Sequence, residues 1–140
     1  MPITTDHAGR TYASTEPYEV TRSRIAEFAA ALGDGPASDA VLPVATPTFA
    51  AVVVNHAWEG FFADPELDLD LARIVHAEQR FSYVRPLEPG DVVTAALRID
   101  KVRVRGGAEL ITTSVAVLDE AGSRVLTAEA TFVHTRKGAA

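Results

Sequence analysis

A run of alternating large residues ends at a proline-containing corner between residues 80 and 91, which read RFSYVRPLEPGD. Pro86 cannot donate a hydrogen bond to a sheet ladder, and Pro89-Gly90 supplies the backbone geometry of a turn. A Val-rich run follows directly after Asp91. Two strands are therefore expected to meet at a defined corner, and the chain beyond it continues in strands.

The chain from residue 74 onward has the alternating pattern of β-strands. We expect one long strand over residues 74–84 and a second strand whose apolar face runs from Val93 to Ile99. Beyond Asp100 the apolar positions shift to Val102 and its alternate neighbours. This change of phase predicts a bulge or a sharp twist near Lys101.

Two further turns are predicted after this strand. Gly106-Gly107 forms the first, residues 110–118 return as a strand, and residues 119–123 form the second. The last strand then has one apolar face, which consists of Leu126, Ala128, Ala130 and Phe132.

A first helix is predicted near the beginning of the chain. Tyr18-Glu19-Val20 alternates like a short strand, and Thr21 then caps a helix that Gly33 ends. The apolar residues of this helix have helical spacing: Ile25, Phe28, Ala29 and Leu32.

A second helix is predicted after a loop that contains Pro36 and Pro43. Thr46 is an expected N-cap, and Pro47 suits the first helical position. The fifteen residues that follow Pro47 read TFAAVVVNHAWEGFF and are apolar on almost every face. A helix of this kind is expected to be buried all round, inside a sheet that wraps it.

Composition limits the classes of function. A length of 140 residues and an apolar fraction of 47% suit one domain with one core, here residues 1–140 with a disordered tail at 136–140. The net charge of −6 argues against broad binding to nucleic acid or anionic membranes. With no cysteine, a polar beginning and short apolar runs, we expect a cytoplasmic protein with no membrane span. The four histidines lack metal-ligand spacing, so no metal site is expected. The functional interpretation given below implies no cofactor.

Three stretches together resemble one family: residues 18–34, the helix start at 46–49, and residues 74–91 with their Arg-Pro and Gly-Asp pairs. They are similar to MaoC-like (R)-specific hydratases and dehydratases, and most of all to small actinobacterial subunits of (3R)-hydroxyacyl-thioester dehydratases. The resemblance implies an α+β chain with a single hot-dog fold, in which a curved antiparallel sheet wraps a long central helix.

The same resemblance bears on catalysis. Hydrating members of the family carry a Gly-Asp-x-Asn-Pro-x-His loop after the first helix, whose Asp and His act on water. Here residues 33–39 read GDGPASD, so Asp34 matches the catalytic aspartate and the histidine is absent. The alternative is that Asp34 is a turn residue after a helix. The shortened loop implies that a partner supplies the complete pair.

Other candidates lie on the second helix. Amides near Thr48 and Phe49 could polarise a thioester carbonyl, although ordinary capping explains them equally. Asn55, His56 and Glu59 share one helix face with Val52. Some hot-dog thioesterases and dehydratases carry a carboxylate on this helix, so the resemblance leaves open a thioesterase in which Glu59 or Asn55 directs water at the thioester carbonyl. The alternative is that these are hydrogen-bonded residues at the mouth of the helix or in a dimer interface. His76, in a strand, is expected to be structural.

Cations cluster on the strand after the corner, at Arg98, Lys101, Arg103 and Arg105. They could bind the phosphates of coenzyme A or the acidic surface of an acyl carrier protein, or simply protect a solvated edge strand. The resemblance implies a subunit of a (3R)-hydroxyacyl-ACP/CoA dehydratase that supplies acyl-chain binding and dimer support. The alternatives are an acyl-CoA thioesterase and a non-catalytic homodimeric acyl-thioester binding protein. In each case we expect an acyl-CoA or acyl-ACP ligand and either a homodimer or a heterodimer with a second hot-dog subunit.

Overall fold

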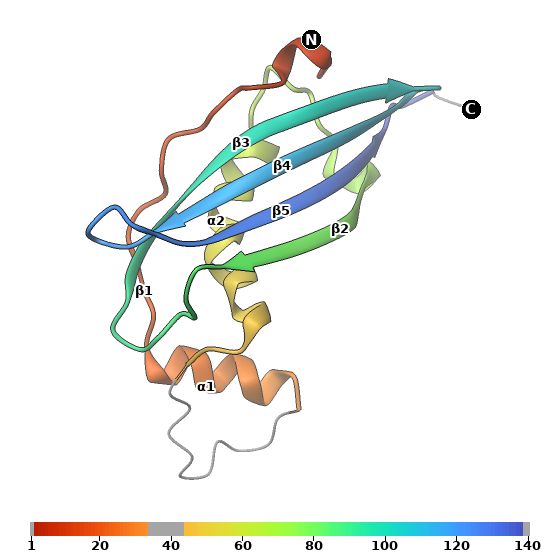
Figure 1. Cartoon of the computed structure of the whole chain (residues 1–140). Coiled ribbons are helices and arrows are strands. Elements are labelled where there is room, and N and C mark those ends of the chain that lie inside the picture. Colours follow the sequence, from red (N-terminus) through yellow and green to blue (C-terminus); the bar gives the residue numbers. More distant parts are fainter. Residues whose placement is uncertain (1, 34–43, 139–140) are drawn as a thin grey trace.

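The computed structural model describes residues 2–33 and 44–138. One curved sheet lies against a long helix, α2, and a shorter helix, α1, lies at the end of the molecule where α2 begins (Figure 1). The helices are α1 (Arg22–Ala31) and α2 (Ala50–Phe62), with short 3-10 turns η1 (Thr5–His7), η2 (Pro47–Phe49) and η3 (Leu71–Arg73). The strands are β1 (Tyr18–Glu19), β2 (Ile74–Tyr83), β3 (Val92–Arg105), β4 (Ala108–Leu118) and β5 (Arg124–Thr135).

The five strands pair antiparallel in the order β1-β3-β4-β5-β2, which confirms the predicted hot-dog architecture. The predicted bulge is also confirmed, because the β3–β4 register shifts between Ile99 and Lys101. A second register shift, which the sequence does not reveal, interrupts the β2–β5 pairing between His76 and Glu78.

The core lies between α2 and the concave face of the sheet. The predicted apolar face of β5 is buried, from Leu126 to Phe132, and the Phe132 ring lies 5.9 Å from that of Phe61 on α2. The prediction that α2 is buried all round is wrong. Its buried residues cover only the sheet-facing part, and Asn55, His56 and Glu59 are exposed on the other side.

The helix beginnings differ from each other. Thr21 caps α1 as predicted, since its side chain accepts a hydrogen bond from the Arg24 amide at 3.2 Å. Thr46 is the N-cap of the 3-10 turn η2, which precedes α2, but its side chain makes no capping hydrogen bond. Leu32, expected on the buried face of α1, is 55% exposed. It lies beyond the last helical residue, where helical periodicity no longer orients the side chain.

The corner between β2 and β3 is closed by an ion pair. The Arg85 guanidinium donates from Nη1 to Asp91 Oδ2 at 2.9 Å and from Nη2 to Asp91 Oδ1 at 3.1 Å. The amide of Glu88 donates to Asp91 Oδ2 at 2.8 Å. The Arg-Pro and Gly-Asp pairs of the sequence therefore build a clasp that fixes where β3 begins.

A buried network holds the end of β5. His134 Nδ1 lies 3.0 Å from Glu109 Oε2, and both residues are almost fully buried. Arg136 donates to the other oxygen of Glu109 and, at 2.8 Å, to the carbonyl of Asp68. Arg136, the first residue of the segment predicted to be disordered, thus belongs to the folded unit.

The two edges of the sheet differ. The segment that precedes β1 hydrogen-bonds along β3, with the amides of Gly9 and Tyr12 donating to the carbonyls of Ile99 and Leu97. The opposite edge is β2, and within residues 2–33 and 44–138 no strand pairs with its outer side. Every residue from Val75 to Arg80 on β2 is exposed. Within the described chain no helix is long and apolar enough to cross a membrane.

Candidate functional site

The exposed face of α2 carries three polar side chains that contact one another. Asn55 Nδ2 donates to Glu59 Oε1 at 3.2 Å, and His56 Nδ1 lies 4.0 Å from Glu59 Oε2. The His56 side chain is 48% exposed and that of Glu59 is 66% exposed. The shared helix face predicted from spacing is therefore real, and it faces away from the core.

A groove borders this face of α2. One hollow of about 370 Å³ lies between the segment 15–18 and the helix residues His56 and Glu59. A second hollow, of about 290 Å³, extends toward α1 and is lined by Tyr18, Arg24, Glu27, Phe28, Phe49 and Val52. Tyr18 lines both hollows, so they adjoin along α2. Both ends of the groove mix polar and apolar surface, and the Phe49 end is the more apolar of the two.

The sequence does not predict the contacts that two tyrosines make at this site. The Tyr18 ring lies 5.9 Å from the His56 ring and 4.6 Å below the Arg24 guanidinium. Tyr83, at the end of β2, donates from its hydroxyl to the carbonyl of Pro47 and so ties the sheet to the beginning of α2. Burial raises the pKa of Tyr83. For Tyr83 the sequence shows only that aromatic residues alternate over residues 80–84. This pattern predicts a strand but does not predict which group the Tyr83 hydroxyl contacts.

The proposed thioester-binding amides are unequal. The Phe49 amide donates to the Thr46 carbonyl at 2.9 Å, so it is already used within the turn. The Phe49 ring is buried and packs edge-on against Phe28 with 5.6 Å between centroids. Thr48 is exposed at the same turn. Phe49 therefore shapes the apolar wall of the groove, and Thr48 is the better placed of the two for a ligand.

Asp34, the predicted catalytic aspartate, lies outside the described residues. The described chain stops at Gly33, just after α1, and resumes at Val44, just before η2. Both flanks thus adjoin the elements that form the Phe28 and Phe49 end of the groove.

An aromatic cluster lies on the other side of α2, toward the open edge of the sheet. The His76 ring lies 5.2 Å from Trp58 and 4.8 Å from Phe132, and His76 Nε2 is 3.0 Å from Gln79 Oε1. These contacts suit the structural role predicted for His76. Trp58 is 9% exposed, and its Nε1 is buried without an acceptor among the residues described.

The predicted cations lie on the convex face of the sheet, and none of them lines the groove beside α2. The β3–β4 register pairs these cations with β4 residues that point away from the core: Arg98 with Ser114, Lys101 with Thr112, and Arg103 with Leu110. The β4 residues between these positions are buried. Arg105 pairs with Ala108 in the same alternation. All four cations are exposed.

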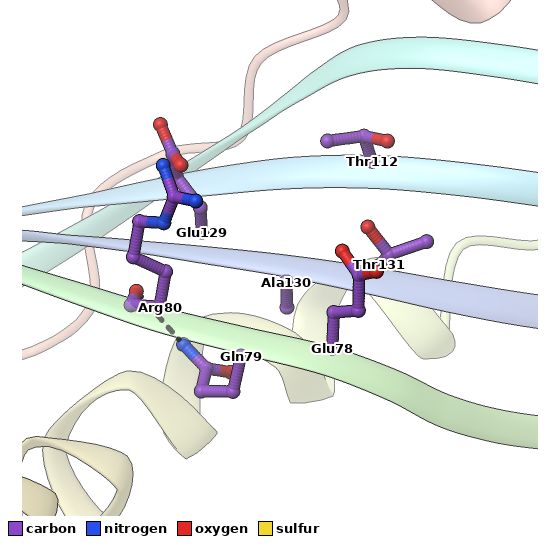
Figure 2. A pocket seen from close by; sticks show the side chains of 7 residues that line it. All are labelled: Glu78, Gln79, Arg80, Thr112, Glu129, Ala130 and Thr131. Carbon is purple, nitrogen blue, oxygen red and sulfur yellow. Dashed lines mark hydrogen bonds between the residues drawn. The ribbon is translucent and has the colours of Figure 1, made fainter.

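A polar hollow of about 460 Å³ lies farther across the sheet, toward β2. Figure 2 shows Glu78, Arg80, Glu129, Thr112 and Thr131 on one side of the sheet, with Gln79 and Ala130 on the helix side. Within the described ranges no group of three or more His, Asp or Glu residues could hold a metal ion.

The chain is similar to known proteins over most of its length. The sequence matches the model of the family described as FAS1-like, dehydratase domain region, over residues 6–128. UPF0336 protein PPA1896 from Cutibacterium acnes is 45% identical over 137 residues, which cover 97% of this chain and 96% of the relative.

Solved structures extend the likeness. A chain of the C-terminally truncated HadBC (3R-hydroxyacyl-ACP dehydratase) complex from Mycobacterium tuberculosis is 28% identical, with a TM-score of 0.79 over 94% of this chain and 99% of that one. A structure titled MaoC-like dehydratase is 26% identical, with a TM-score of 0.79 over 92% of this chain and 42% of that one. The chain therefore belongs to the FAS1-like dehydratase-region family and has the MaoC-like hot-dog fold.

Proposed function

We propose that this chain is a subunit of a (3R)-hydroxyacyl-thioester dehydratase or hydratase, and that it supplies the acyl groove while a second hot-dog subunit supplies the acid–base pair. The observation that carries the proposal is the content of the loop between the two helices. Residues 33–45 contain Asp34 and Asp39 but no histidine.

The chemistry explains why this absence matters. Dehydration removes a proton from C2 of the acyl chain and expels the C3 hydroxyl as water, so a base and an acid must lie on one side of the substrate. His56 is the histidine on the groove, and its nearest charged neighbour is Glu59. That pair lies at the mouth of the groove, in solvent, where a bound acyl chain would be poorly shielded from water.

The unequal edges of the sheet support a subunit role. One edge is covered by the segment before β1, while the outer side of β2 pairs with no other strand of the described chain and carries the exposed apolar side chain of Val75. An exposed, unpaired strand favours pairing with another strand. The related HadBC dehydratase is itself a complex. We therefore place a second hot-dog chain along β2, where it would also cover the aromatic cluster of Trp58 and His76.

The substrate class follows from the groove. Its more apolar end, with Phe28, Phe49 and Val52, suits an acyl chain, and the end beside His56 and Glu59 suits a thioester and its amide-containing arm. Either coenzyme A or an acyl carrier protein can present such an arm, and the groove residues do not distinguish these carriers.

A second candidate rests on the Asn55–Glu59 contact. A carboxylate on the central helix with a neighbouring amide could orient a water molecule toward a thioester carbonyl, as a thioesterase requires. Hydrolysis would release a free thiol, whereas hydration adds water across a double bond and releases none. The two reactions are therefore separable in one assay series.

The test is co-expression with a hot-dog subunit from the same genome that carries Gly-Asp-x-Asn-Pro-x-His. The expected result is a one-to-one complex that hydrates crotonyl-CoA, while this chain alone is about 10²–10⁴-fold slower. Replacing the partner's loop histidine should abolish activity, and Asp34→Asn in this chain should leave most of it. Robust turnover by this chain alone that Asp34→Asn abolishes would overturn the proposal.

The same preparations test the thioesterase reading. Thiol release from acyl-CoA that Glu59→Gln abolishes, with the exposed Glu120→Gln as the matched control, would favour the second candidate. Acyl-thioester binding without either reaction, in the complex and in the chain alone, would indicate a binding protein instead.

A further inference from the structure

We infer that the convex face of β3 is a docking surface for an acidic protein, the carrier that brings the acyl thioester. The identity of that protein as the carrier rests on the function proposed above. The docking surface itself is argued from Arg98, Lys101, Arg103 and Arg105, and these four residues are here termed the basic row.

The bulge in β3 creates the basic row. In a regular strand Arg98 would share a face with Asp100 and Val102, while Lys101 and Arg103 would point to the opposite face. The register shift between Ile99 and Lys101 reverses this alternation, so that Val102 is buried and the cations on both sides of the bulge share the convex face. One local irregularity thus gathers four positive charges on one surface.

The charges of the basic row are largely available. Arg98 Nε lies 3.8 Å from Asp100 Oδ1, and this is the row's one ion pair within residues 2–33 and 44–138. The neighbouring positions on β4 are Thr112 and Ser114, which carry no charge. The rest of the chain is acidic, with a net charge of −6. An approaching acidic surface is therefore repelled by most of the molecule and attracted here.

The length of the row indicates the kind of anion. At about 3.3 Å per residue, the distance from residue 98 to residue 105 is roughly 20 Å. A line of that length matches carboxylates spread along a helix of a small protein better than the phosphates of one nucleotide.

The far side of the same face does not continue the basic row. Glu78, Arg80 and Glu129 line the polar hollow beside β2 (Figure 2), so the convex face is basic at β3 and of mixed charge toward β2. An acidic surface is therefore attracted to β3 more than to the region beside β2.

The experiment measures binding of purified actinobacterial acyl carrier protein, without an acyl group, to the full chain by calorimetry at low and high salt. The double variant Arg103→Glu/Arg105→Glu should weaken binding about tenfold or more and flatten its salt dependence. The control Arg22→Glu/Arg73→Glu has the same net charge but lies off the basic row, and it should change affinity less than threefold. Circular dichroism verifies that both variants are folded.

Several outcomes would overturn the inference. Equal weakening by both double variants would show that net charge alone matters, and unchanged binding would remove the basic row from the interface. Tighter binding of a short DNA duplex or of phosphatidylglycerol vesicles than of the carrier would assign the row to another polyanion. Because the assay uses no acyl group and no catalysis, the result stands whether or not the hydratase test succeeds.

Discussion

Replacing Asp91 by alanine should destabilise the domain by about 2 kcal/mol, because the Asp91 carboxylate closes the corner between β2 and β3. It accepts two hydrogen bonds from Arg85 and one from the Glu88 amide. Hydrogen bonds to charged groups contribute about 1.5–3 kcal/mol each when shielded, but exposed ion pairs contribute about 1 kcal/mol or less. The Asp91 side chain is 16% exposed and that of Arg85 is 36% exposed, which places the sum between these limits.

The measurement is the free energy of unfolding in urea, with the melting temperature beside it. A loss of about 2 kcal/mol corresponds to a fall of about 6 °C for a domain of this size. The matched control is Asp119→Asn, which removes the charge 3.6 Å from the same guanidinium but keeps an oxygen that can accept from the amides of Ala121 and Ser123, and which should cost about 0.5 kcal/mol or less. Equal losses in the two variants, or a negligible loss in Asp91→Ala, would refute the clasp as the reason for the Arg-Pro and Gly-Asp pairs.

Two further predictions concern buried and paired carboxylates. Burial alone would raise the pKa of Asp64, but the hydrogen bonds from Tyr12 and the Glu66 amide, with the Arg10 charge, outweigh it and hold that pKa below its usual value of 3.8. The stability gained is present above about pH 4 and is lost as the pH falls through the lower folded pKa. The melting temperature of Asp64→Asn should therefore change less than that of the wild type between pH 5 and pH 3. Glu109→Leu should cost about 3 kcal/mol in urea unfolding because it leaves the Arg136 charge without its buried partner, whereas Glu129→Leu on the exposed face should cost about 0.5 kcal/mol or less.

The sheet could be predicted from the sequence because the pattern of alternating apolar residues within each strand is enough to identify it. Alternation assigns each side chain of β3 to β5 to one face, and the change of phase at Asp100 reveals the bulge. The bulge at Ala77 on β2 is different, since residues 74–80 are exposed or half-buried and carry no clear apolar phase to be broken.

The surroundings of α2 could not be predicted in the same way. The almost continuous apolar sequence of α2 indicates that burial of this helix is favourable, but it does not indicate which part of the chain covers each helix face. The sheet covers Val53, Ala57 and Phe61, while His56 and Glu59 border a groove whose other wall comes from residues 15–18. That wall lies about forty positions away in the sequence, beyond the reach of any periodicity.

If a second subunit pairs with β2, it would cover one side of α2 and leave the other side accessible. The side of Trp58 and His76 adjoins β2, so a partner strand and its own helix would cover the aromatic cluster and could supply the acceptor that Trp58 Nε1 lacks among the described residues. On the side of Tyr18 the edge of the sheet is instead occupied by the chain itself, because the segment before β1 is hydrogen-bonded along β3. A second subunit cannot pair with the sheet there. The groove beside Tyr18 would then remain the accessible side of α2, so an acyl thioester would have to enter past His56 and Glu59. Substitutions at Tyr18 should therefore alter substrate affinity in the complex without altering its assembly.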